Sequence, residues 1–314
     1  MKKMLFLLAG LIAVSCNEKN EIVAPYVARV SLTVQNLPHL ESGHYQLWAK
    51  FVLFNKQAGG DAPLHDDGYQ SLGEFNVRES DGAIVGADGG TVRFALPADR
   101  DPQLLTDVAI AVQPPEIVTF KVQHEEVGPI LLAGKFHGTA ATAAADLSVL
   151  HTDALQTQFT ALSGRCSITC PTSPADSNNG VWFVNLGPPI SPGLQGLPSL
   201  PTQWKYEGWV VSGGQAYSTG RFARADSADL DGAGPYRGPG TPINFPGQDF
   251  VLGAVRLSLV DTGFTFMVTV EPDPDNSSDP FFVKVLSARS GGRSVTFQNV
   301  AANSLPTARV VVER

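Results

Sequence analysis

Charged residues are scarce in this chain, and basic residues are scarcer than acidic ones. Only 17% of the 314 residues are Asp, Glu, Lys or Arg, and the formal net charge is −8. A protein that binds nucleic acid presents a basic face to the phosphates. The charge balance therefore argues against a nucleic-acid partner.

Signatures of common catalytic and cofactor sites are also missing. The sequence contains no Gly-x-Ser-x-Gly nucleophile elbow, no His-Glu-x-x-His, no phosphate-binding Gly-x-x-x-x-Gly-Lys and no dinucleotide fingerprint. Its six histidines are scattered singly. We therefore expect no cofactor, and we predict a protein that is not an enzyme.

Cysteine is rare, with three residues in all. Cys166 and Cys170 would lie on one face of a strand, about 13 Å apart at roughly 3.3 Å per residue. A disulfide needs Cα atoms within about 7 Å, so it would require a turn here. A zinc site would need a second Cys or His pair, which the sequence lacks. We favour two buried free thiols.

The only long apolar run, Leu5–Val14, is too short to span a bilayer and follows Met1-Lys-Lys-Met4. It ends in Ala13-Val-Ser-Cys16, which resembles the lipobox of bacterial lipoproteins. The resemblance implies cleavage before Cys16, which would carry the lipid anchor; an ordinary secretory signal is the alternative. We predict a signal peptide over 1–16 and a polar tether over 17–27. No Asp follows Cys16, which by resemblance to enterobacterial sorting favours the outer membrane, on its periplasmic or its surface face.

Glycine and proline, in contrast, are abundant. With 31 Gly, 23 Pro and 43% hydrophobic residues, the composition favours short strands joined by turns. A set of three motifs also occurs twice, which indicates an internal repeat. The first set is Leu37-Pro-His-Leu40, Tyr45-Gln-Leu-Trp48 and Ser71-Leu-Gly-Glu-Phe75; the second is Leu197-Pro-Ser-Leu200, Tyr206-Glu-Gly-Trp209 and Ser218-Thr-Gly-Arg-Phe222.

We therefore predict an all-β chain of two tandem sandwich- or barrel-like domains. The first domain covers 28–138, the linker 139–164 and the second domain 165–314. Thr91–Leu96 and Val255–Val260 are predicted as equivalent strands of the two copies.

The order of these motifs, followed by Val268-Thr-Val-Glu-Pro272, resembles the extracytoplasmic C-terminal domain of anti-sigma-K factors. Gly180-Val-Trp-Phe183 and Phe245-Pro-Gly-Gln-Asp-Phe250 are similar to motifs of uncharacterised bacterial lipoproteins. The resemblance covers most of 28–138 and 165–290. Anti-sigma-K factors hold sigma through a cytoplasmic N-terminal domain, whereas here a signal, an anchor Cys and a tether precede the first copy. We expect the module without the sigma-binding activity.

Two acidic residues are candidates for catalysis. Glu207 and Glu271 occupy repeat positions where the first copy has Gln46 and Gln113. A carboxylate pair in an open cleft is the arrangement of a carbohydrate hydrolase. A carbohydrate hydrolase is therefore the alternative function. The structural alternative is that Glu207 and Glu271 only stabilise the hairpins that contain them.

A metal site is a weaker possibility. Asp273, Asp275 and Asp279 place oxygens as the start of a calcium loop does. Ser278 and Lys284 stand where that loop requires Gly and an acid. We therefore expect a polar turn and no metal, with these three as a weak calcium candidate.

Binding residues are sought where the two copies differ. We assign Tyr45, Trp48, Tyr206 and Trp209 to the core, because their spacing recurs in both copies. The candidate contacts are Trp204, Tyr236 in the Gly/Pro loop 231–247, and Asp61, His65 and Asp66 in the insertion 55–68. We predict a lipid-anchored envelope protein that binds a protein or a polysaccharide; a purely structural envelope module is a further alternative.

Overall fold

Short antiparallel strands joined by turns and loops build the ordered chain. The computed structural model describes residues 28–54, 63–64, 68–86, 88–113, 126–251, 253, 258–275 and 277–314. In these residues all strand pairs are antiparallel, and the only helices are three 3-10 turns, Pro102–Leu104, Pro174–Asp176 and Ala301–Asn303. The all-β prediction is confirmed. None of the helices described is long and apolar enough to cross a membrane.

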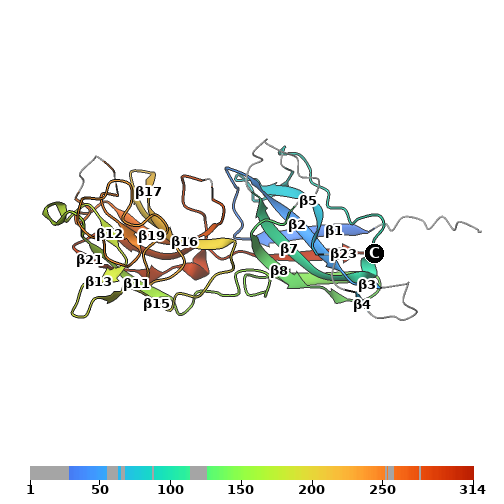
Figure 1. Cartoon of the computed structure of the whole chain (residues 1–314). Helices are drawn as coiled ribbons and strands as arrows, with labels where there is room; N and C mark the ends of the chain where they lie inside the picture. The colour runs from blue at the N-terminus through green and yellow to red at the C-terminus, as the bar shows by residue number, and fades with distance from the viewer. Residues whose placement is uncertain are drawn as a thin grey trace, which may run out of the picture.

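The chain folds into two β units that lie end to end (Figure 1). In the first unit a five-stranded sheet, β6-β5-β2-β7-β8, packs on a four-stranded sheet, β1-β23-β10-β9, over a shared apolar core. The strands are β1 (Arg29–Gln35), β2 (His44–Phe51), β3 (Leu53–Phe54), β4 (Pro63–Leu64), β5 (Gln70–Val77), β6 (Ile84–Val85), β7 (Leu105–Gln113), β8 (Ile130–Lys135), β9 (His137–Gly138), β10 (Thr142–Leu147) and β23 (Thr307–Glu313).

The second unit also has a five-stranded sheet, β17-β16-β19-β20-β22. It lies against β15-β11-β12-β18, with β21 paired to β11, and a small β13-β14 hairpin. The strands are β11 (Ser163–Ile168), β12 (Val181–Trp182), β13 (Val184–Asn185), β14 (Ser191–Pro192), β15 (Leu194–Gln195), β16 (Trp204–Ser212), β17 (Gln215–Phe222), β18 (Gly247–Gln248), β19 (Thr265–Pro272), β20 (Lys284–Arg289), β21 (Ser294–Thr296) and β22 (Gln298–Asn299).

The last strand belongs to the first unit, not to the second. β23 lies between β1 and β10, pairing Val310 with Leu32 on one side and with Ala145 on the other. The boundaries predicted at 139–164 and 165–314 therefore differ from the structure, because β10 falls inside the predicted linker and β23 inside the predicted second domain. The alternation of Ala308, Val310 and Val312 predicts a strand, but it carries no information on which sheet that strand enters.

The hairpins that carry the repeated motifs have matching contacts. β5-β2-β7-β8 and β17-β16-β19-β20 have the same strand order. The Tyr45 hydroxyl donates to the Pro38 carbonyl at 3.0 Å, and the Tyr206 hydroxyl donates to the Pro198 carbonyl at 2.8 Å. Each Tyr ring stacks on the Phe of the neighbouring strand, with centroids 5.4 and 5.8 Å apart. The likeness covers these four strands, since the second sheets of the two units differ in strand order.

The predicted strand Thr91–Leu96 does not form, and the described part of the predicted strand Val255–Val260 is not a strand either. Residues 91–97 belong to no strand, although the Ala95 N–H donates to the Leu72 carbonyl of β5 at 3.0 Å, and 258–260 lie in a turn region; 254–257 lie outside the described residues. Val92, Phe94 and Leu96 still turn inward and are half-buried, which explains the alternation.

The two units share one continuous core rather than being joined by a free linker. The chain crosses between them twice, at 148–162 and again at 300–306 on its way to β23. Asn299 fixes the first crossing, because its side-chain amide donates to the carbonyls of Phe159 and Leu162 at 2.7 and 2.8 Å. The relative position of the units is therefore held by packing and by hydrogen bonds.

Candidate functional site

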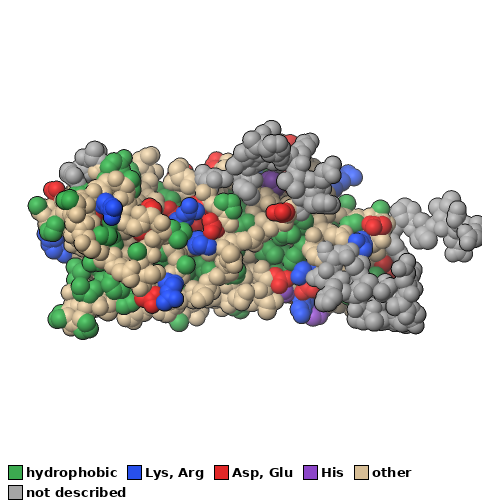
Figure 2. All heavy atoms as spheres, in the orientation of Figure 1, with side chains coloured by type: hydrophobic (Ala, Val, Ile, Leu, Met, Phe, Trp, Pro, Cys, Tyr) green, Lys and Arg blue, Asp and Glu red, His purple; other side chains and the backbone are tan. Residues whose placement is uncertain are grey.

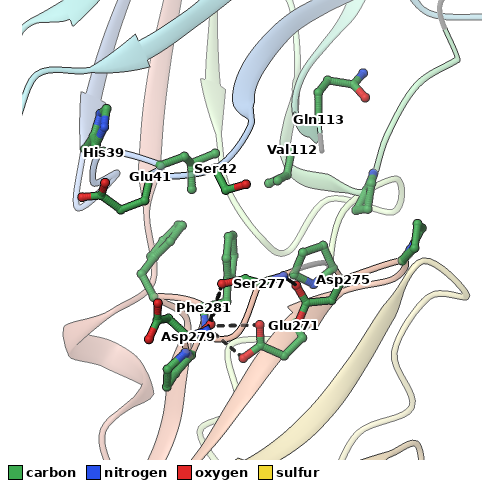
Figure 3. A pocket seen from close by; sticks show the side chains of 16 residues that line it. His39, Glu41, Ser42, Val112, Gln113, Glu271, Asp275, Ser277, Asp279 and Phe281 are labelled. Carbon is green, nitrogen blue, oxygen red and sulfur yellow. Dashed lines mark hydrogen bonds between the residues drawn. The ribbon is translucent and has the colours of Figure 1, made fainter. Parts of the chain in front are cut away.

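A cleft opens where the two units meet. Its cavity volume is about 200 Å³. One wall consists of residues 39–42, Val112, Gln113 and Pro129 of the first unit, and the other of the end of β19 and the segment that follows it to Phe282. In Figure 3, His39, Glu41 and Ser42 face Glu271, Ser277 and Asp279 across this cleft.

The wall from the second unit is held by a buried carboxylate. Glu271 is 1% exposed, and its two oxygens accept the backbone N–H of Phe281 at 3.0 and 3.2 Å. The hydroxyl of Thr269 donates to the same carboxylate. The Phe281 ring lies 4.4 Å from that of Phe282 and 6.0 Å from that of Trp204, centroid to centroid. These contacts order the wall without a ligand.

The wall from the first unit is equally well fixed. The Asn76 side chain bonds the backbone of Leu40 in both directions, at 3.0 Å each. His39 Nδ1 lies 3.0 Å from the Val77 carbonyl, which can only accept, so this nitrogen carries the proton. Gln113 donates to the Gln46 side-chain oxygen at 2.8 Å. The cleft is thus a hollow with side-chain hydrogen bonds holding the backbone of each wall.

The lining combines apolar and acidic groups. Leu40, Val112, Phe281, Phe282 and several prolines form the apolar part. Four carboxylic acids, Glu41, Glu271, Asp275 and Asp279, also line the cleft, whereas its described lining includes no Lys or Arg. A site of this kind suits a ligand that is partly apolar and positively charged.

The candidate pair Glu207 and Glu271 lies on one sheet face, on adjacent strands. Glu207 pairs with Thr269 across β16 and β19, and Lys205 pairs with Glu271, so the two glutamates are diagonal neighbours. Burial raises the pKa of Glu207 to about 7 and that of Glu271 to about 8, and the Glu207 charge contributes to the shift at Glu271.

Of this pair, only Glu271 lies in the lining of the cleft. Glu207 is 5% exposed, is absent from the cleft lining and accepts a hydrogen bond from the Ser218 hydroxyl at 2.5 Å. In the first unit the equivalent positions hold neutral amides: Gln46 donates to Ser71 at 2.8 Å and accepts from Gln113. The two units therefore place amides and carboxylates at equivalent positions but bond them differently: Gln113 donates to Gln46, whereas Glu207 accepts from Ser218 and Glu271 accepts from Thr269 and Phe281.

Trp204 is a correction to the sequence interpretation. It was expected to be an exposed contact, but it is 2% exposed and packs in the core against Phe281. Trp204 has no counterpart in the first set of motifs, and the Phe281 ring on which it packs belongs to the cleft wall of the second unit. Tyr45, Trp48, Tyr206 and Trp209 are buried as predicted.

Tyr236 does lie at the surface, with 56% of its side chain exposed. Its loop is fastened below by Asp249, a fully buried carboxylate that accepts the Trp182 indole N–H at 2.8 Å and the backbone N–H of Thr172 at 3.0 Å. The Thr172 hydroxyl donates to Asp249 and accepts from Gly238 N–H at 2.7 Å. The loop that presents Tyr236 is therefore anchored and does not line the cleft.

The other predicted sites fall outside the described residues or are used by the fold. Cys16, Asp61, His65 and Asp66 lie outside the described residues, as does most of the 55–68 insertion. Cys166 and Cys170 are free and buried, as predicted.

Two of the three residues of the weak calcium candidate have partners within the chain. Asp273 forms ion pairs with Lys205 at 3.0 Å and with Arg221 at 3.7 Å, and Asp275 accepts the Ser277 N–H at 2.8 Å. Across the described part of the chain, no three His, Cys, Asp or Glu side chains are grouped to hold a metal ion.

On the face shown in Figure 2, Lys and Arg side chains are dispersed among acidic ones and gather into no basic patch within the described residues. Comparisons with protein-family models, with curated proteins and with solved structures return no match for the chain.

Sequence reasoning missed the cleft itself. Its walls come from residues near 40, 112 and 275, which the fold brings together only through docking of the two units. The sequence does hold one indication of the wall from the second unit. The prolines Pro272, Pro274 and Pro280 end β19 and stiffen the segment beyond it.

Proposed function

We propose that this chain is a lipid-anchored protein of the bacterial cell envelope that binds a partner without catalysing a reaction, through the cleft between its two β units. The observation that carries the proposal is the preformed cleft, with Asn76 fixing one wall and Glu271 the other. A site that is ordered before binding saves the entropy cost of ordering it.

The hydrogen bonds that Glu207 and Glu271 already accept within the chain support binding over hydrolysis. A general acid and a nucleophile must reach the substrate, whereas the carboxylate of Glu271 is already bonded to Phe281 and that of Glu207 to Ser218. The resemblance to the anti-sigma-K C-terminal domain is also consistent with a binding module. The proposed location in the cell envelope rests on the lipobox-like sequence Ala13-Val-Ser-Cys16.

A steric block of the cleft tests the binding proposal. Ser42 is exposed and lines the cleft, so Ser42→Trp should fill the hollow and leave the fold intact. Ser80 is exposed in a turn away from the cleft, and Ser80→Trp is the matched control. In a pull-down from envelopes, Ser42→Trp should lose a partner that wild type and Ser80→Trp retain. Equal recovery by all three proteins contradicts the proposal.

The anchor is tested separately. Cys16→Ala should release the protein from membranes into the soluble fraction, because the acylated Cys supplies the attachment. Membrane retention of the variant contradicts lipid anchoring at Cys16 and leaves the cleft experiment unaffected.

A further inference from the structure

The cleft offers an apolar surface and unused negative charge side by side. The rings of Phe281 and Phe282 and the side chains of Leu40 and Val112 provide the apolar surface. The long basic side chains of proteins match this combination, since their methylene stems pack on apolar surface while the charged head stays with water or a carboxylate.

Two of the four lining carboxylates are already engaged by the chain. Glu271 binds the Phe281 N–H, and Asp275 accepts the Ser277 N–H and lies in the field of Arg221. Glu41 and Asp279, in contrast, are exposed on opposite walls, and within the described residues neither carboxylate takes part in a hydrogen bond or ion pair. They carry the negative charge that a ligand would meet.

The size of the hollow limits what can enter it. About 200 Å³ is room for a long side chain with its adjacent backbone, and not for an α-helix, whose diameter is about 10 Å. The occupant is therefore an extended segment.

We propose that the cleft receives a Lys or Arg side chain from an extended segment of a partner protein. The stem lies on Phe281 and Phe282, and the charged head is held between Glu41 and Asp279. This inference rests on the proposed binding function of the cleft and adds the chemistry of the partner.

The test is an NMR titration of the purified mature protein with two peptides up to millimolar concentration. The first is Gly-Ala-Lys-Ala-Gly-Ala-Lys-Ala-Gly, and the second has norleucine in place of both lysines, which keeps the stem and removes the charge. The lysine peptide should shift resonances of the cleft walls and bind at least about tenfold more tightly than the norleucine peptide. Glu41→Gln with Asp279→Asn should weaken the affinity for the lysine peptide by about three- to twentyfold, since each exposed ion pair contributes a few-fold to affinity.

A charge-matched control separates the cleft from the general negative charge of the protein. Glu79 and Asp261 are exposed, lie outside the cleft lining and have side chains without a described partner. Glu79→Gln with Asp261→Asn should bind the lysine peptide as wild type does. An equal loss in both double variants overturns the inference.

The remaining outcomes distinguish the inference from the function on which it rests. If Ser42→Trp abolishes partner recovery from envelopes but neither peptide binds, or both bind alike, the ligand chemistry is wrong and the cleft function stands. If spermidine shifts the same resonances and the lysine peptide does not, a small polycation replaces the protein partner and the inference fails. If Ser42→Trp changes no binding at all, the cleft function and the inference fall together.

Discussion

Glu207 and Glu271 lie diagonally on adjacent strands of one sheet face, and both carboxyl groups are buried. The first unit fills the same two positions with Gln46 and Gln113, which are hydrogen-bonded to each other. Burial favours the protonated form of a carboxylic acid, and a protonated carboxyl group can donate as an amide does. The second unit therefore places two titratable groups where the first unit has two neutral amides.

This difference predicts a pH-dependent stability. The pKa values of Glu207 and Glu271 are raised from 4.5 to about 7 and about 8. The folded protein therefore binds more protons than the unfolded chain between about pH 4.5 and pH 8, so these groups lower the free energy of unfolding as pH rises through that window. Glu207→Gln with Glu271→Gln should remove this slope and be about 2–4 kcal/mol more stable than wild type at pH 9.

Urea unfolding at pH 5 and at pH 9 measures the effect. The exposed Glu79→Gln, which removes a carboxylate outside this pair, serves as the control. If the free energy of unfolding depends on pH in the same way in wild type and in the double variant, this account of the pair is wrong.

The position of β23 predicts that the extreme C-terminus stabilises the first unit. Val310 is fully buried between Leu32 and Ala145, so Val310→Asp places an unpaired carboxylate in the core and should cost at least about 4 kcal/mol. Thr307→Asp, at an exposed position of the same strand, should change stability by no more than about 0.5 kcal/mol.

Thermal unfolding of the two variants decides the matter. Val310→Asp should unfold at a much lower temperature, and amide exchange should become fast in β1, whose strand pairing in the described structure is with β23. Slow exchange in β1 of a folded Val310→Asp variant contradicts the assignment of β23 to this sheet.

The buried carboxylate of Asp249 should control the order of the 231–247 loop. In Asp249→Asn one of the two accepting oxygens becomes an amide nitrogen, so either the Thr172 N–H or the Trp182 indole N–H loses its acceptor. We expect a cost of about 1.5–3 kcal/mol and faster proteolysis near Tyr236. Asp261→Asn, at an exposed position, provides the comparison; the same proteolysis rate in both variants would show that Asp249 does not anchor the loop.

The sequence predicts the hairpins better than it predicts their assembly. Apolar and aromatic side chains bounded by turn residues identify β2, β5, β16, β17 and β19, because the burial of a strand on one or both faces is recorded in its own side chains. The partner of β23 leaves no such record, since Val310 would be as apolar in either unit. Trp204 was misassigned for a related reason: the Phe281 that covers it lies 77 positions further along the chain.

The cleft was beyond the reach of sequence reasoning on the same grounds. Glu41 and Asp279 look like ordinary polar turn residues until the two units dock and place them on opposite walls. Glu207 and Glu271, which the comparison of the two motif sets does single out, are both buried, and of the two only Glu271 lies in the cleft lining.

Site-specific photo-cross-linking in living cells tests the central claim most directly. A photoreactive amino acid at position 42 lies in the cleft, and the same group at position 80 lies in an exposed turn outside it. We predict a discrete protein adduct from position 42 that is absent from position 80 and is weakened when Glu41→Gln and Asp279→Asn are introduced. Identical adducts from both positions, or an adduct from position 42 that is indifferent to those two substitutions, would contradict binding through the acidic cleft.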